Sequence, residues 1–287
     1  RYRDIQTFTD DGPNLLDAVD WALELGQTDD VLVVSLAAIE YLIILGDFRK
    51  AVALCKRALD LGWIVQDRIS IARFANLEAW ILVQLGDLQA AEELGLVALQ
   101  EYEEVGNIEG SIGALLTAST VYRKQGHFKK ARELSDRAWN LVKDLGTNDL
   151  EAWVNDQYGK IARDAGEWES AWEYFTIAAR LEFQATGVSY TDERYHALYG
   201  GQLALVAYHL GKPQEAKDLC LRTMEATRHH RRQHDIATLT YRLALAEEAL
   251  GENDAARKHA QEALDQFDRL GMKLDYDEAR ILFDRLQ

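Results

Sequence analysis

The residues best suited to chemistry in this 287-residue chain are the histidines gathered at 229–234 and the carboxylates gathered at 101–104. His230 and His234 lie four residues apart, a spacing at which two imidazoles on one helix can reach the same metal ion. The repeat described below places a junction between helices here, so we expect a solvated basic junction that could contact an acidic partner. The carboxylates belong to an amphipathic stretch, where exposed acidic side chains are usual. We therefore predict no catalytic residue, no metal site and no cofactor.

Nucleophilic and nucleotide chemistry find equally little support. Cys55 and Cys220 occupy the same position in repeats far apart along the chain, too distant for a disulfide, and are predicted to be small buried residues in a reducing compartment. No Gly-x-x-x-x-Gly-Lys-Ser/Thr loop for phosphate is present. An enzyme such as a helical-repeat hydrolase would need a tight cluster of polar groups with shifted pKa values. The sequence predicts a protein that is not an enzyme.

A repeat of about 40 residues defines the elements that must position any site. Six glycines are separated by 40, 40, 40, 45 and 40 residues: Gly46, Gly86, Gly126, Gly166, Gly211 and Gly251. An alanine follows each glycine after five residues, and a second small residue after twelve: Ala51 and Ala58, Ala91 and Ala98, Ala131 and Ala138, Ala171 and Ala178, Ala216 and Thr223, Ala256 and Ala263. A fixed period of this length indicates stacked supersecondary units that each contact their neighbours.

Each repeat is predicted to be a pair of helices that meet at the glycine, which takes the left-handed conformation that ends the first helix. Asp47 and Asp87 suit the cap of the second helix, and Pro13 and Pro213 suit helix starts. First helices are expected near 30–45, 69–85, 108–125, 149–165, 191–210 and 233–250. Second helices are expected near 48–61, 88–104, 128–144, 168–185, 213–228 and 253–269. Further turns are expected at Gly62, Gly106, Gly146 and Gly271, with a longer one around 187–192.

These elements predict one all-α domain over 1–287. It consists of an N-terminal capping or linker helix in 1–28, six repeats over 30–270 and a C-terminal capping helix at 274–287. The formal charge of −16 disfavours nonspecific nucleic-acid binding and repels anionic membranes. No apolar stretch reaches the roughly 18 residues that span a bilayer. We predict a cytoplasmic protein without direct nucleic-acid or membrane partners, and expect Arg1 to begin a fragment of a longer protein.

The pattern Gly-(Asp)-aromatic-x-x-Ala, with a second alanine seven residues later, resembles the tetratricopeptide repeat. It is seen at 46–51, 126–131 and 166–171, and the family's small first-helix residue is matched by Ala79, Ser119, Gly159, Ala204 and Ala244. Ile39 departs from that pattern, the family's proline after the second helix is absent, and the period exceeds 34 residues. The longer repeat is similar to those of kinesin light chains and of the sensor arms of STAND-type signalling NTPases. The resemblance implies a right-handed superhelical solenoid of about six to seven helix pairs.

The segment 14–24, Asn-Leu-Leu-Asp-Ala-Val-Asp-Trp-Ala-Leu-Glu, resembles the helix that opens the repeat arm of STAND NTPases. The alternative is an ordinary capping helix whose Leu15, Val19 and Ala22 face the stack while Trp21 covers an edge. The resemblance implies a non-catalytic sensor or scaffold arm of a larger signalling regulator, which binds a protein, a peptide or a small-molecule inducer. The alternative is a free-standing adaptor that docks partner peptides, as kinesin light chains do.

In the family, the first helices line the concave surface, with exposed positions 13, 10, 6, 3 and 2 residues before the glycine. By that analogy the candidate peptide-binding groove contains Arg73, Asn76, Trp80, Gln84, Arg123, Lys124, Trp153, Asp156, Lys160, Arg163, Tyr208 and Tyr241, and the same positions hold Gly201, Leu205, His209 and Glu248. Five basic side chains with aromatic neighbours would suit an extended acidic or aromatic-bearing peptide. The alternative is a solvated helix face with scattered charges.

Overall fold

The chain folds as a series of antiparallel α-helices in a computed structural model that describes residues 5–25, 27–186, 199–226 and 233–287. No β-strand occurs in these ranges. The chain divides into two compact units, Arg1–Lys124 and Gln125–Gln287. Unit 1 contains α1 (Ile5–Glu24), α2 (Thr28–Leu45), α3 (Phe48–Val65), α4 (Arg68–Leu85), α5 (Leu88–Glu104) and α6 (Ile108–Lys124).

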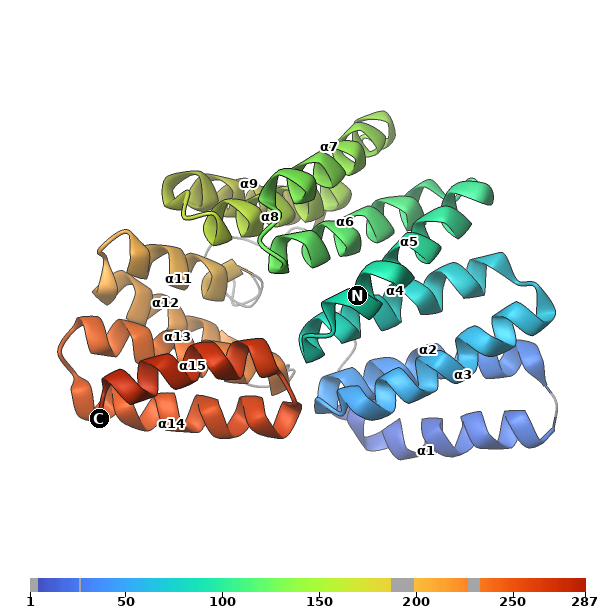
Figure 1. The fold of residues 1–287 in the computed structure, drawn as a ribbon, viewed down its shortest axis with the longest axis horizontal. Helices are drawn as coiled ribbons and strands as arrows, with labels where there is room; N and C mark the ends of the chain where they lie inside the picture. The colour runs from blue at the N-terminus through green and yellow to red at the C-terminus, as the bar shows by residue number, and fades with distance from the viewer. Residues whose placement is uncertain (1–4, 26, 187–198, 227–232) are drawn as a thin grey trace. The chain divides into compact units, whose positions relative to one another are not determined.

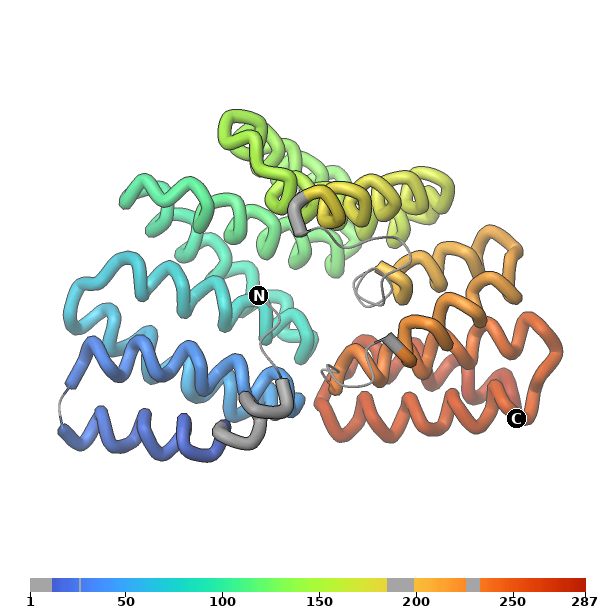
Figure 2. The backbone as a smooth tube through the Cα atoms, turned by 180° about the vertical axis from the view of Figure 1, so that it is seen from behind, coloured from blue at the N-terminus to red at the C-terminus, as the bar shows by residue number. Residues whose placement is uncertain are grey.

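Unit 2 follows the same alternation of first and second helices. It contains α7 (Phe128–Leu145), α8 (Asn148–Asp164), α9 (Trp168–Thr186), α11 (Gly201–His209), α12 (Pro213–Ala226), α13 (Gln233–Ala249), α14 (Asn253–Leu270) and α15 (Lys273–Arg285). Within each unit, consecutive helices run back and forth beside one another (Figures 1 and 2). The all-helical prediction and the predicted order of helices are therefore confirmed. That the whole chain is one domain stays a prediction, and the longer turn expected at 187–192 lies outside the described residues.

The repeat glycines end the first helices as predicted. Gly46 has a φ of 77°, and the amide of Asp47 donates to the carbonyl of Leu42 at 2.9 Å, which closes the helix end. The other five repeat glycines also have positive φ. The Asp47 carboxylate then accepts from the amide of Lys50 at 3.2 Å and caps α3. Asp87 caps α5 in the same way, whereas Glu252 precedes α14 without a side-chain cap, so the shared feature of these turns is the glycine and not the cap.

The alanines of the repeat make close helix packing possible. All six alanines that follow the glycines after five residues are at most 1% exposed, as are the five alanines that follow after twelve. Thr223 takes the sixth of these positions with 2% exposure, and its hydroxyl donates to the carbonyl of Leu219 at 2.7 Å. Such a close crossing of two helices has room for a methyl group, or for a hydroxyl that donates to a carbonyl of its own helix.

First helices also pack on one another within a unit, α4 on α6, α11 on α13 and α13 on α15. In these three pairs the exposed faces of neighbouring first helices therefore lie side by side. This arrangement is what the tetratricopeptide resemblance predicts for the wall of a groove.

Three of the four second turns are confirmed, and the turn at Gly62 is a correction. Gly106, Gly146 and Gly271 have φ values of 68°, 65° and 71°. Gly62 instead lies inside α3, and Gln66 makes the turn with a φ of 58°. A Cβ on Gly62 would lie 3.2 Å from Cγ1 of Ile71, so this glycine lets α3 approach α4.

The predicted helix start at Pro13 is wrong, whereas Pro213 does begin α12. Pro13 lies inside α1, directly after Gly12, whose missing side chain leaves room for the ring of Tyr41. Val19 and Ala22 are buried as the capping-helix interpretation expected, but Trp21 is 70% exposed and covers no edge.

Both cysteines, Cys55 and Cys220, are free and buried, as predicted. Burial raises the pKa of each thiol, so both are uncharged at neutral pH. Among the described residues, no helix combines the length and the apolar character needed to cross a bilayer.

Candidate functional site

In unit 1, the predicted groove positions lie on α4 and α6 and are partly used for packing. Trp80 packs edge-on against Phe48, with ring centroids 6.3 Å apart. Arg73 is exposed and lies near the hydroxyl of Tyr102, where it opposes the rise in the Tyr102 pKa that burial causes. Oδ1 of Asn76 is buried and accepts no hydrogen bond from the described residues.

The remaining unit 1 positions differ in exposure. Gln84 and Lys124 are partly exposed, whereas Arg123 is only 6% exposed. Arg123 thus lies mostly within the protein, where it is less available to a ligand than the resemblance implies. Because Lys124 ends unit 1, whether these basic residues share one patch with Lys160 and Arg163 of unit 2 stays a prediction.

In α8 of unit 2, the predicted positions are Trp153, Asp156, Lys160 and Arg163. Trp153 is 48% exposed and presents an aromatic ring to solvent. Asp156 and Lys160 form an ion pair of 2.5 Å across one helical turn, so they largely neutralise each other. Arg163 pairs with the adjacent Asp164 at 2.6 Å, and its side chain is only 11% exposed.

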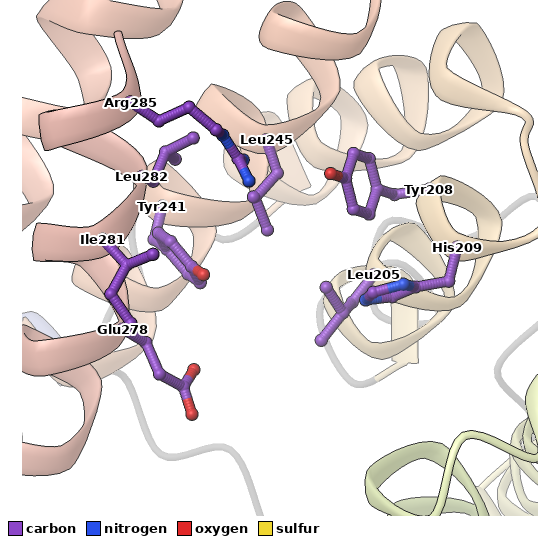
Figure 3. A pocket seen from close by; sticks show the side chains of 9 residues that line it. All are labelled: Leu205, Tyr208, His209, Tyr241, Leu245, Glu278, Ile281, Leu282 and Arg285. Atoms are coloured by element: carbon purple, nitrogen blue, oxygen red, sulfur yellow. The ribbon is translucent and has the colours of Figure 1, made fainter. Parts of the chain in front are cut away.

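A cavity of about 280 Å³ lies further along the same surface, where α11, α13 and α15 meet. Its lining consists of Leu205, Tyr208, His209, Tyr241, Leu245, Glu278, Ile281, Leu282 and Arg285. Figure 3 shows the α11 side chains on one side of the space and those of α13 and α15 on the other. The structure thus brings the predicted residues Tyr208 and Tyr241 to one site, together with Leu205 and His209.

The cavity combines an apolar floor with a few oriented polar groups. Leu245 and Leu282 are buried, and Tyr241 packs on Phe267 with centroids 6.4 Å apart. Burial raises the pKa of Tyr241, so its phenol stays protonated and can donate a hydrogen bond. At the rim, Arg285 binds Glu248 through two N–H groups at 2.5 Å each.

His209 forms an aromatic corner of the cavity. Its ring stacks on Trp168 with centroids 3.8 Å apart and an interplanar angle of 6°. The ring of Tyr208 meets it nearly at right angles, at 4.9 Å. Burial, followed by the charge of Arg163, lowers the pKa of His209, so the imidazole is neutral at pH 7. A neutral flat ring favours apolar and aromatic ligand groups.

Next to this cavity, two arginines from different helices converge on one glutamine. Gln202 Oε1 accepts from Nη1 of Arg163 at 2.5 Å and from Nη2 of Arg242 at 3.2 Å. Arg163 comes from α8, Gln202 from α11 and Arg242 from α13, so three successive first helices contribute. Arg163 was predicted from the sequence; Gln202 and Arg242 were not, because both lie nine residues before a repeat glycine.

A sequence signal for this arrangement existed in Gly201. A glycine in a helix disfavours the helix by about 1 kcal/mol relative to alanine, so it usually has a packing reason. Here a Cβ would lie 3.0 Å from Nη1 of Arg242 and 3.1 Å from Cδ2 of Leu239. The glycine therefore allows the guanidinium to lie against α11.

Sequence reasoning also missed the contribution of α15, which was predicted only as a cap. Its residues Glu278, Ile281, Leu282 and Arg285 form one wall of the cavity. Ile281 is 68% exposed, and its place at the cavity could not be read from the sequence, because a terminal helix has no repeat register.

The histidine cluster lies mostly outside the described residues, at 227–232. Within the part of the chain that the structure describes, no group of three or more His, Cys, Asp or Glu side chains is placed to hold a metal ion. His234, at the start of α13, is buried beside Asp235, with Nε2 3.3 Å from its carboxylate.

No protein-family model and no curated protein sequence matches this chain. Solved structures do. A Rap protein complexed with competence and sporulation factor is 16% identical and superposes with a TM-score of 0.62 over 88% of this chain and 74% of the other. Aspartyl phosphate phosphatase F from Bacillus subtilis is 14% identical, with a TM-score of 0.58 over 93% and 73%.

A tetratricopeptide repeat protein from Parabacteroides merdae is 14% identical, with a TM-score of 0.56 over 96% of this chain and 99% of that one. At these identities the likeness establishes the fold. This chain has the tetratricopeptide-type helical-repeat fold, as its glycine and alanine spacing predicted.

Proposed function

We propose that this protein binds a peptide, or a short segment of a partner protein, on the first-helix surface of unit 2. The observation that carries the proposal is the cavity between α11, α13 and α15, with Tyr208 and Tyr241 in its wall. Its volume of about 280 Å³ lies at the lower limit of ligand pockets, roughly 300–1,000 Å³. Such a space suits one or two apolar side chains of a longer ligand.

The residue types support the same conclusion. Tyrosine and arginine are enriched among residues that dominate binding energies, because they offer large contact areas with a polar end. A helical-repeat surface is extended, so contacts on either side of the cavity can add affinity. The Rap protein in the complex with competence and sporulation factor has the same fold, which supports binding on such a surface.

The proposed role is non-catalytic. Among the described residues, the side chains that line the cavity include no serine, threonine or cysteine that could act as a nucleophile, and the histidine that they do include, His209, is stacked on Trp168. The polar groups that remain can orient a ligand by hydrogen bonds.

A library of synthetic peptides, in which each position is held in turn apolar, aromatic, acidic or basic, tests the proposal. We expect this protein to enrich peptides with a large apolar residue at one position. Ile281→Arg places a long charged side chain at the cavity and should abolish the enrichment. Ile64→Arg is the matched control, because Ile64 is 76% exposed in unit 1 and should tolerate the same change. Equal binding of the selected peptides to wild type and to Ile281→Arg would refute the proposal.

We further propose that the chain is the cytoplasmic sensor arm of a larger signalling regulator of the STAND NTPase type. This wider role is supported by the resemblance of residues 14–24 to the helix that opens such arms. A free-standing adaptor is the alternative. In the full gene, a Gly-x-x-x-x-Gly-Lys-Ser/Thr loop encoded before Arg1 would favour the sensor arm. An open reading frame without that loop would favour the adaptor.

A further inference from the structure

We propose that Arg163 and Arg242 together bind a carboxylate group of the peptide ligand, beside the apolar residue that enters the cavity. This inference rests on the proposed function and specifies the chemistry of its ligand. The carboxylate belongs either to the peptide's C-terminus or to an acidic side chain, and the experiment below separates the two.

The first step is the geometry of the pair. Because Gln202 Oε1 accepts a hydrogen bond from each guanidinium, at 2.5 Å and 3.2 Å, both groups are held toward one point. A guanidinium carries five N–H donors in a fixed plane, so each arginine retains donors for a ligand. Paired N–H groups of arginine match the two oxygens of a carboxylate.

The second step is charge. Arg163 and Arg242 carry two positive charges, of which Asp164 offsets one at 2.6 Å. Within the described ranges no carboxylate lies at ion-pair distance from Arg242; Asp275 and Asp235 act on it from further away. Among the described residues, one positive charge of the pair therefore has no carboxylate in direct contact with it, which suits a singly charged carboxylate better than a doubly charged phosphate.

The third step is desolvation. Burial, with the nearby charge of Arg163, lowers the pKa of Arg242 to about 10. The arginine is still charged at pH 7, but it is held where its charge is disfavoured. A bound anion would remove that penalty. Gly201 maintains the arrangement, since a Cβ there would meet Nη1 of Arg242 at 3.0 Å.

The fourth step is register. Leu205 lies three residues after Gln202 on α11, and Leu245 lies three residues after Arg242 on α13, which places each leucine on the same helix face as its polar neighbour. Both leucines line the cavity. The arginine pair and the apolar cavity are therefore adjacent, one helical turn apart, and a ligand that fills both carries an apolar side chain next to a carboxylate.

The test uses four forms of one library-selected peptide that keep its apolar residue. The first ends in a free carboxylate and has no acidic side chain. The second is amidated and carries one glutamate beside the apolar residue, the third is amidated and uncharged, and the fourth is amidated and carries phosphoserine. Affinities are measured by fluorescence anisotropy at 50 and 150 mM salt.

We expect one of the two carboxylate peptides to bind wild type about tenfold or more tightly than the uncharged peptide. Which of the two does so identifies the source of the carboxylate. Arg242→Gln and Arg163→Gln should each abolish this preference, so that the carboxylate peptides bind each variant no more tightly than the uncharged peptide does. Arg257→Gln is the charge-matched control, because Arg257 is exposed on the second helix α14. It should leave the preference intact.

Equal binding of all four peptides to wild type would overturn the inference, and this arm does not depend on any variant folding. Tighter binding of the phosphoserine peptide than of both carboxylate peptides would also overturn it. In either case, loss of binding in Ile281→Arg would leave the proposed function standing. If Ile281→Arg binds as wild type does, the proposed function itself fails.

Discussion

Replacing Glu78 with glutamine should stabilise the protein at alkaline pH and have little effect near pH 4.5. Glu78 lies on α4, is only 2% exposed, and its Oε2 has no hydrogen-bond partner among the described residues. It faces the region of the buried thiol of Cys55, whose pKa rises first through burial and then through the charge of Glu78. This carboxyl group therefore occupies a core position that would suit an apolar residue.

Burial raises the pKa of Glu78 from 4.5 to about 7; the charge of Lys56 opposes this rise and that of Asp60 adds to it. Between these two pH values the folded chain keeps the proton and the unfolded chain has lost it. The contribution of Glu78 to stability is therefore most favourable below pH 4.5, falls as the pH rises toward 7, and stays low above it. At about 1.4 kcal/mol for each pH unit, the loss amounts to at most about 3 kcal/mol.

The assay is urea unfolding of wild type and Glu78→Gln at pH 5, 6, 7 and 8, followed by circular dichroism. We expect the free energy of unfolding of the variant to exceed that of wild type by a margin that grows with pH and reaches up to about 3 kcal/mol at pH 8. Glu101→Gln is the control: Glu101 is also buried, at 6% exposure, but it accepts from Arg68 at 2.9 Å. Loss of this ion pair should destabilise the protein at pH 8. A gap between Glu78→Gln and wild type that does not widen with pH would refute the reasoning.

Two further substitutions test the packing and turn arguments by thermal or urea unfolding. Gly159→Ala should destabilise by about 1–3 kcal/mol, because its Cβ would lie 2.7 Å from the ring of Phe175, which is fully buried. Gly113→Ala is its control and should stabilise by about 1 kcal/mol, since the nearest atom is 4.0 Å away; similar effects of both changes would contradict the packing account. Gln66→Gly should stabilise the protein by roughly 1 kcal/mol, because Gln66 has a φ of 58°, which glycine adopts without strain. A destabilised variant would contradict this, since it would mean that the Gln66 side chain stabilises the fold by more than its left-handed backbone destabilises it.

The sequence predicts local features of this fold because they depend on single residues. A glycine at a fixed interval can end a helix, and an alanine can mark a close crossing, without knowledge of the rest of the chain. Gly62 shows where this reasoning fails. A glycine can make a left-handed turn or allow two helices to approach closely. Only the packing of Ile71 against Gly62 shows that this glycine has the second role.

The candidate site was less predictable because it depends on the offset between helices. Arg163 lies three residues before its repeat glycine. It nevertheless donates to Gln202, which also accepts from Arg242, and these two residues each lie nine residues before a repeat glycine. The position of a residue within its own repeat does not say which residue of the next first helix lies beside it. The contribution of Ile281 was missed for a related reason, since a terminal helix has no repeat register from which to predict its contacts.

The most direct test of the binding surface is photo-crosslinking of a library-selected peptide that carries a benzophenone in place of its apolar residue. The attachment points are then mapped by mass spectrometry. The account predicts crosslinks on α11, α13 and α15, at side chains that line the cavity, and their loss in Ile281→Arg. Crosslinks concentrated on the second helices α12 and α14, or on unit 1, would contradict it.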